Sequence, residues 1–124
     1  MRKIYTIGHS TKKWEVFLKE IESVDYDKLV DVRSTPYSRW NPQYNKNRII
    51  QEIGDKYIFM GDSLGGLDDN ISEEDFLDGI KKLSELGKNE TVVFFCSEGK
   101  HKDCHRDFKI TPYMIQEGFE VIHL

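Results

Sequence analysis

The run Thr-Val-Val-Phe-Phe at residues 91–95 constrains the fold of this chain most strongly. Its β-branched and aromatic residues do not alternate with polar ones, which predicts a strand buried on both faces. Such strands are typical of parallel sheets that helices cover on both sides. We expect the chemistry of the chain to begin where this strand ends, because open α/β sheets bind ligands beyond the carboxyl ends of their strands.

Shorter strands alternate with helical patterns along the rest of the chain. Strands are predicted at residues 4–7, 29–32, 57–60 and 119–123, with helices between them. This alternation predicts an α/β fold with a mostly parallel five-stranded sheet, helices on both faces and a Rossmann-like three-layer architecture. Right-handed crossovers favour the strand order 3-2-1-4-5, which brings the first and fourth strands together.

Capping signals predict the ends of the first two helices. Ser10 or Thr11 is the expected N-cap of the first helix, whose apolar stripe consists of Trp14, Phe17, Leu18 and Ile21. Asn41 and Pro42 are the expected N-cap and first residue of the second helix, and Gly54 is its expected end. The inner face of the second helix is predicted to carry Ile49, Ile50 and Ile53.

The later helices show similar signals. Ser72 begins a near capping box, Gly87 suits the C′ position of the same helix, and its buried stripe is predicted to be Phe76, Leu77, Ile80 and Leu83. The last helical region spans about residues 103–117, and Pro112 lies too far inside it for a first-turn position. We expect the helix to break there, with a second helix beginning at Thr111.

Length and composition indicate a single α/β domain over residues 1–124. The chain is 38% hydrophobic and 32% charged, and none of its apolar runs approaches the roughly 18 residues of a membrane span. The first residues lack the pattern of a signal peptide, so we expect a cytoplasmic protein. A net charge of −4 argues against binding nucleic acid through a broad basic surface, although other modes of nucleic-acid binding stay open.

The segment from Cys96 to Arg106 is the first candidate for a functional site. If the sheet is parallel, its carboxyl ends also bring residues 8–10 and the loop after residue 32 to the same edge. The candidate catalytic residues are Cys96, Glu98, His105 and His9. The candidate substrate-binding residues are Ser10, Arg33, Ser34, Arg39, Cys104 and Arg106.

The arginines favour an anionic ligand. Arg33, Arg39 and Arg106 can hold a phosphate or carboxylate through paired hydrogen bonds. The alternative for either loop arginine is structural: each can pair with Asp31, Glu98 or Asp103 and fix the loop. Glu98 likewise serves either as a general acid or base, or as a partner that orients an arginine.

Cys96 has several alternative roles. It can be a nucleophile, because nearby cationic residues favour the thiolate and His105 or His9 can act as the base. Alternatively, it can simply pack at the end of the strand. A phosphatase loop is excluded because position 102 is Lys rather than Arg. A reducing compartment favours free thiols or metal ligands, although a Cys96–Cys104 disulfide can serve redox sensing. The set of Cys96, His101, Cys104 and His105 lacks the spacing of a zinc site, so we expect no metal and no cofactor.

Five sequence blocks together resemble the domain of unknown function 488 family. They are Ile-Gly-His-Ser (7–10), Asp-Val-Arg-Ser-x-Pro-x-Ser-Arg (31–39), Leu-Gly-Gly (64–66), Cys-x-Glu (96–98) and Cys-His-Arg (104–106). The resemblance implies a compact α/β domain with a shared site built from these blocks, and it implies no established reaction. Pro112 departs from the regular helix that follows Cys-His-Arg in such proteins.

These observations favour an enzyme that acts on an anionic small molecule, a nucleotide or a nucleic-acid component. The alternative is a non-catalytic module that binds an anion or phosphate, and a metal or redox site ranks below both. Under either of the first two hypotheses the partner is an anionic or nucleotide-like ligand rather than a membrane, and the sequence does not indicate an oligomeric state.

Overall fold

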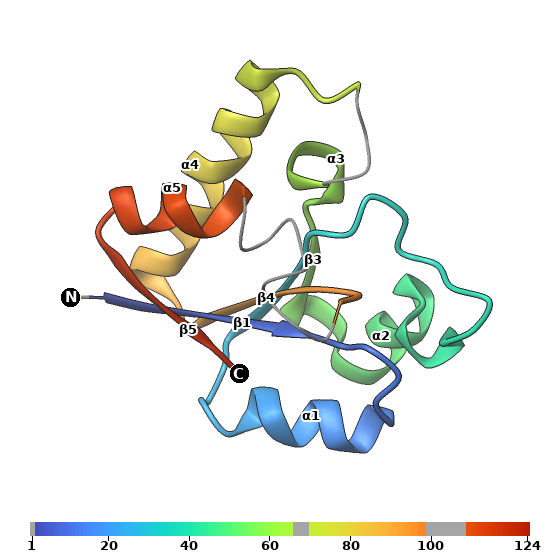
Figure 1. Ribbon diagram of the computed structural model, residues 1–124. Helices are drawn as coiled ribbons and strands as arrows, with labels where there is room; N and C mark the ends of the chain where they lie inside the picture. Colours follow the sequence, from blue (N-terminus) through green and yellow to red (C-terminus); the bar gives the residue numbers. More distant parts are fainter. Residues whose placement is uncertain (1, 66–69, 99–108) are drawn as a thin grey trace.

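The computed structural model describes residues 2–65, 70–98 and 109–124 and contains one parallel sheet (Figure 1). Its strands are β1 (Arg2–Gly8), β2 (Lys28–Asp31), β3 (Tyr57–Phe59), β4 (Val92–Cys96) and β5 (Phe119–His123). Every pairing is parallel, and the strand order is β3-β2-β4-β1-β5. The predicted α/β fold with a five-stranded parallel sheet is therefore confirmed.

Helices cover both faces of this sheet. One face carries α1 (Trp14–Glu22) and α2 (Lys46–Ile53), together with the short 3-10 helices η1 (Pro42–Tyr44) and η2 (Gly54–Lys56). The other face carries α3 (Gly61–Leu64), α4 (Glu73–Asn89) and α5 (Thr111–Gln116). The three layers can be followed in Figure 1. No helix in the described parts of the chain is long and apolar enough to cross a membrane.

The central strand β4 contributes to both halves of the core. Its residues are all buried, and successive side chains of a strand point to opposite faces. Val93 and Phe95 pack into the cluster that includes Phe17 of α1. Val92 and Phe94 pack into the cluster that includes Leu83 of α4. This confirms that the strand at residues 91–95 is buried on both faces.

The expected strand order is wrong for β1 and β4, which exchange places, so that β5 lies beside β1 rather than β4. β1 and β4 are neighbours as expected, but β4 rather than β1 lies next to β2. The reason is burial, because the middle of a five-stranded sheet has neighbours on both edges and helices on both faces. The strand that is apolar along its whole length occupies that position.

The beginnings of α1 and α2 differ from the prediction. Lys13 is the N-cap residue of α1 and makes no capping hydrogen bond with its side chain. Ser10 cannot cap the helix because it lies in the turn after β1 with a left-handed φ of 49°. Asn41 and Pro42 begin η1 rather than α2, which starts only at Lys46. The predicted end at Gly54 is confirmed, whereas Ile50 is 41% exposed and does not face the core.

The later helix signals were partly right. The Ser72 hydroxyl accepts a hydrogen bond from the Asp75 N–H at 3.0 Å, which confirms the cap of α4. Gly87 is not the end of α4, which continues to Asn89; a Cβ at Gly87 would lie 2.9 Å from the Phe119 ring, so this glycine allows close packing. Leu77 is exposed. α5 begins at Thr111 with Pro112 in its first turn, as predicted, but residues 109–110 directly before it are π-helical, so the described residues do not show the predicted break. The rest of the predicted region, residues 103–108, lies outside the described residues.

Candidate functional site

Three loops meet at the carboxyl-terminal edge of the sheet. The His9 N–H donates to the Cys96 carbonyl at 3.0 Å, and the Ser10 N–H donates to the Ser97 carbonyl at 2.9 Å. On the other side of β4, the Val32 N–H donates to the Phe95 carbonyl at 3.0 Å. The loops after β1, β2 and β4 therefore leave the sheet side by side, as the parallel arrangement predicts.

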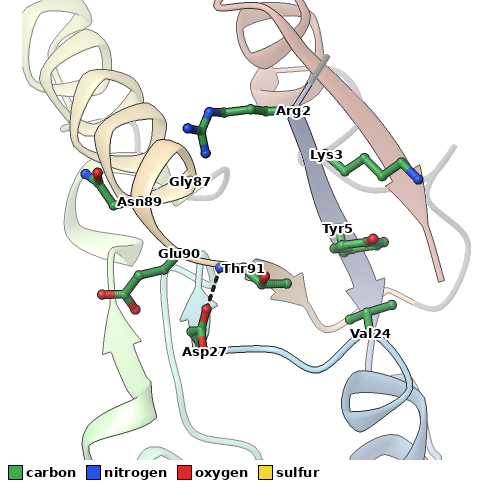
Figure 2. Close-up of a pocket in the computed structure, with 9 residues that line it drawn as sticks. All are labelled: Arg2, Lys3, Tyr5, Val24, Asp27, Gly87, Asn89, Glu90 and Thr91. Atoms are coloured by element: carbon green, nitrogen blue, oxygen red, sulfur yellow. Dashed lines mark hydrogen bonds between the residues drawn. The ribbon is translucent and has the colours of Figure 1, made fainter.

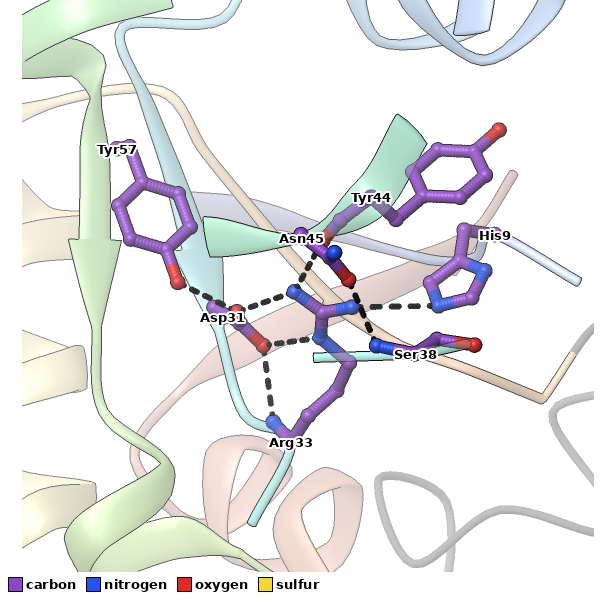
Figure 3. A network of polar contacts seen from close by, with 7 residues as sticks. All are labelled: His9, Asp31, Arg33, Ser38, Tyr44, Asn45 and Tyr57. Atoms are coloured by element: carbon purple, nitrogen blue, oxygen red, sulfur yellow. Dashed lines mark hydrogen bonds and ion pairs between the residues drawn. The ribbon is translucent and has the colours of Figure 1, made fainter. Parts of the chain in front are cut away.

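Arg33 forms a buried ion pair with Asp31 at this edge (Figure 3). Its Nε donates to Asp31 Oδ1 at 2.9 Å and its Nη2 donates to Oδ2 at 2.7 Å, so the contact is bidentate. Arg33 is 5% exposed and Asp31 is fully buried. The guanidinium also lies over the Phe95 ring, with Cζ 4.9 Å from the ring centre. This pairing with Asp31 is the structural role that the sequence offered as the alternative to anion binding.

The Asp31 carboxylate is fully occupied by hydrogen bonds. Oδ1 accepts from the Arg33 backbone N–H at 3.0 Å in addition to Nε, and Oδ2 accepts from the Tyr57 hydroxyl at 2.5 Å in addition to Nη2. Burial, and then the charge of Asp31, raise the pKa of Tyr57. A buried carboxylate is tolerated when its oxygens are satisfied in this way. The Asp31–Arg33 pair is therefore a rigid unit without net charge.

His9 completes the polar network as a neutral ring. Its Nδ1 lies 2.7 Å from the Ser10 carbonyl, which assigns the proton to Nδ1, and Nε2 then accepts from Arg33 Nη1 at 3.4 Å (Figure 3). Burial, opposed by the Ser10 carbonyl and assisted by the Arg33 charge, lowers the pKa of His9 to about 4. Both ring nitrogens thus face protein groups, and His9 positions Arg33 in this arrangement.

Tyr44 connects the Arg33 loop to the first helix. Its carbonyl accepts from Arg33 Nη2 at 2.8 Å, its ring stacks on His9 with 4.2 Å between ring centres, and its hydroxyl donates to the Lys12 carbonyl at 2.7 Å. Burial raises the pKa of Tyr44 to about 12. Residues 34–43 therefore form a loop whose two ends, Arg33 and Tyr44, are tied together at the edge of the sheet.

α3 packs against the other side of the same loop. A Cβ at Gly61 would lie 1.8 Å from the Arg33 carbonyl oxygen, and one at Gly65 would lie 2.4 Å from Ser34 Oγ. Only glycine allows the two backbones to approach this closely. This close contact explains why glycines occur at the two ends of α3, and it places the partly buried Ser34 beneath α3.

The remaining candidates after β4 differ in accessibility. Cys96 is 2% exposed, with Sγ 3.7 Å from the Glu98 carbonyl oxygen, and it is disulfide-bonded in the structure rather than a free thiol. Ser97 and Glu98 are exposed, Ser10 is partly exposed, and Arg39 in the loop after β2 is exposed. The candidates Cys104, His105 and Arg106 lie outside the described residues, as does His101.

The sequence did not predict that Tyr44 and Tyr57 belong to this network, and it predicted Asp31 only as a partner for an arginine. Asp31 interrupts the apolar run Leu-Val-Asp-Val, and a charged residue in a buried strand needs a partner, so the sequence did carry a signal for it. Tyr44 and Tyr57 carried no such signal, because a tyrosine before a helix or in a strand is common in ordinary cores. Within the described ranges, His, Cys, Asp and Glu side chains do not gather into a group of three that could hold a metal ion.

A separate hollow lies at the opposite, amino-terminal edge of the sheet (Figure 2). Its lining mixes both signs of charge, with Arg2 and Lys3 on β1 and with Asp27 and Glu90 on the loops before β2 and β4. Asp27 accepts a hydrogen bond there from the Thr91 N–H at 2.8 Å. None of the candidate residues of the carboxyl-terminal edge lines this hollow.

Comparison with protein families identifies one match. A family model described as "Domain of unknown function DUF488" matches residues 13–75. The matched range includes the Arg33 loop, Tyr44 and Tyr57, and it ends before β4. Searches of curated proteins and of solved structures gave no match.

Proposed function

The chain belongs to the family described as domain of unknown function DUF488, and we propose that it binds the anionic group of a nucleotide or nucleic-acid component at the carboxyl-terminal edge of its sheet. The observation that carries this proposal is the charge of residues 32–51, which include the loop tied to that edge and the first turns of α2. Residues 32–51 contain no Asp or Glu, although the chain as a whole has a net charge of −4. The same range contains Arg33, Arg39, Lys46 and Arg48.

The two loop arginines have different parts in this proposal. Arg33 is neutralised by Asp31, so it fixes the loop rather than supplying free charge. Arg39 is exposed, and its guanidinium is suited to two parallel hydrogen bonds with a phosphate. We assign the direct contact with the anion to Arg39, and we assign the positioning of its loop to the Asp31–Arg33 pair.

Thermal stability in the presence of ligand tests this proposal. A ligand that binds only the folded state raises the melting temperature, so inorganic pyrophosphate and nucleoside monophosphates should raise it for the native protein. Arg39→Ala should lose this shift, whereas Lys81→Ala, which removes an exposed cation from α4, should keep it. Equal shifts in both variants, or no shift with any of these anions, would overturn the proposal.

An enzyme acting on the same ligand is the second candidate, and the position of Glu98 favours it. Glu98 is exposed just beyond β4, where an acid or base could reach a bound ligand, whereas His9 and Cys96 are buried. Glu98→Gln should abolish turnover of a nucleotide, followed by chromatography, without removing the thermal shift. Full turnover in both Glu98→Gln and Cys96→Ser would show that neither residue is the catalytic group, and no turnover by the native protein would leave binding as the function.

A further inference from the structure

The loop between β2 and η1 presents large aromatic side chains to solvent. Trp40 is 85% exposed and Tyr37 is 53% exposed, although aromatic side chains usually bury most of their surface. Arg39 lies beside Trp40 in the sequence and is exposed as well. In Figure 1 this loop swings away from the sheet before it returns toward α2. Two ring faces and a guanidinium are therefore available on one short loop.

Hydrogen bonds fix the backbone of this loop. The Ser38 N–H donates to Asn45 Oδ1 at 2.7 Å, a contact visible beside Arg33 in Figure 3. The Ser38 hydroxyl in turn accepts from the N–H groups of Trp40 at 3.2 Å and Asn41 at 3.0 Å. The Lys46 N–H donates to the Pro36 carbonyl at 2.9 Å. The exposure of Trp40 is thus a consequence of how the loop is folded. Because the loop backbone is already ordered, a ligand would bind at little cost in backbone conformational entropy.

We propose that Tyr37, Arg39 and Trp40 form a stacking surface for single-stranded nucleic acid. Bases would stack on the two rings, and Arg39 would contact a backbone phosphate. Stacking on aromatic side chains combined with cationic contacts is the general mode by which single strands are bound. This inference rests on the proposed anion site and names its ligand class, because the same arginine and the same acid-free loop supply the charge.

The geometry favours a single strand over three other ligands. Double-stranded nucleic acid needs a broad basic surface, which a chain of net charge −4 does not suggest. A free nucleotide is usually enclosed in a pocket that buries most of its surface, whereas the Trp40 ring is open. An acidic protein would use the cations but would gain nothing specific from exposed ring faces. Unpaired bases use both features, since every base has a π-face.

Binding of short fluorescent oligo(U) and oligo(dU), followed by anisotropy, tests this inference. Trp40→Ala should weaken binding by about tenfold or more, and Trp40→Phe should weaken it less because a ring remains. The matched control is Ile115→Ala, which shortens an apolar side chain that is 58% exposed on α5 and should leave affinity unchanged. With the one phosphate contact of Arg39, log K against log salt should have a shallow slope of roughly −0.7. Comparison of oligo(U) with oligo(dU), which differ only in the sugar, shows whether the 2′-hydroxyl matters.

The outcomes separate this inference from the proposed anion site. Unchanged oligonucleotide affinity in Trp40→Ala, or no binding to the native protein at low salt, overturns the stacking surface, and the anion site still stands if pyrophosphate raises the melting temperature. Loss of oligonucleotide binding in both Trp40→Ala and Arg39→Ala supports the stacking surface even if pyrophosphate has no effect. Binding of polyglutamate as tightly as oligo(U), with the same dependence on Trp40, overturns the inference in favour of an acidic protein partner.

Discussion

At the scale of single residues, the neutral state of His9 makes stability depend on pH. The pKa of His9 is about 4 in the fold and about 6.5 in an unfolded chain. Unfolding therefore takes up a proton between these values, so the free energy of unfolding should fall as the pH drops from about 6.5 to about 4. The contribution of His9 is fully present above the upper value, and its total size is about 3 kcal/mol. Denaturant titrations at several pH values across this range measure the fall.

Carboxylates also titrate near the lower end of this range, so the fall in stability of the native protein alone does not isolate the contribution of His9. A variant at position 9 is therefore needed for comparison. His9→Asn is expected to be less stable at neutral pH, because it loses the stacking on Tyr44 and the ring nitrogen that faces Arg33. Its stability should nevertheless fall less steeply between the two pH values than that of the native protein. Parallel curves for the two proteins would show that His9 does not carry the effect.

The residues of the site show how far sequence reasoning reaches at this scale. The pattern predicted which segments meet at the edge of the sheet, because parallel strands place their carboxyl ends together. It could not choose between an Arg33 that binds a ligand and an Arg33 that pairs with Asp31, since both use the same guanidinium geometry. That choice depends on the burial of the guanidinium, which comes from contacts beyond its own strand: it lies over the Phe95 ring of β4 and donates to the Tyr44 carbonyl of η1.

At the scale of elements, the contact between α3 and the Arg33 loop leads to the next prediction. A methyl group at Gly61 would overlap the Arg33 carbonyl oxygen, and backbone atoms cannot move aside as a flexible side chain can. Gly61→Ala should therefore lower the free energy of unfolding by about 2 kcal/mol or more, despite the higher helix propensity of alanine. Denaturant unfolding measures this loss, and Asp62→Ala, an exposed change in the same helix, should stay within about 0.5 kcal/mol of the native protein. Similar losses in the two variants would contradict the close contact.

Errors in the predicted elements have a common physical origin in tertiary contacts. Ser10 is a good capping residue by type, but the turn after β1 places it in a left-handed conformation. Gly87 is a good helix end by type, but the Phe119 ring requires a residue without Cβ inside α4. Ser72 and Gly54 were predicted correctly because their roles depend on local hydrogen bonding and backbone geometry alone.

At the scale of the whole molecule, the two halves of the core depend on one strand. β4 sends alternate side chains into the cluster under α1 and α2 and into the cluster under α4 and α5. The hydrophobic run at residues 91–95 revealed that the strand was buried on both faces, but crossover rules alone did not reveal that it lies between β1 and β2. A strand shared in this way should couple the two faces during unfolding.

We therefore expect the protein to unfold as one cooperative unit. In a Trp40→Phe background, Trp14 is the remaining tryptophan and reports on the face of the sheet covered by α1. Its fluorescence transition in denaturant should coincide with the loss of far-ultraviolet circular dichroism. Phe94→Ala removes a fully buried ring from the opposite face and should lower the free energy of unfolding by about 3–5 kcal/mol by both probes. A Trp14 transition that stays in place while the circular dichroism transition moves would show that the two faces unfold separately, and β4 would then not couple them.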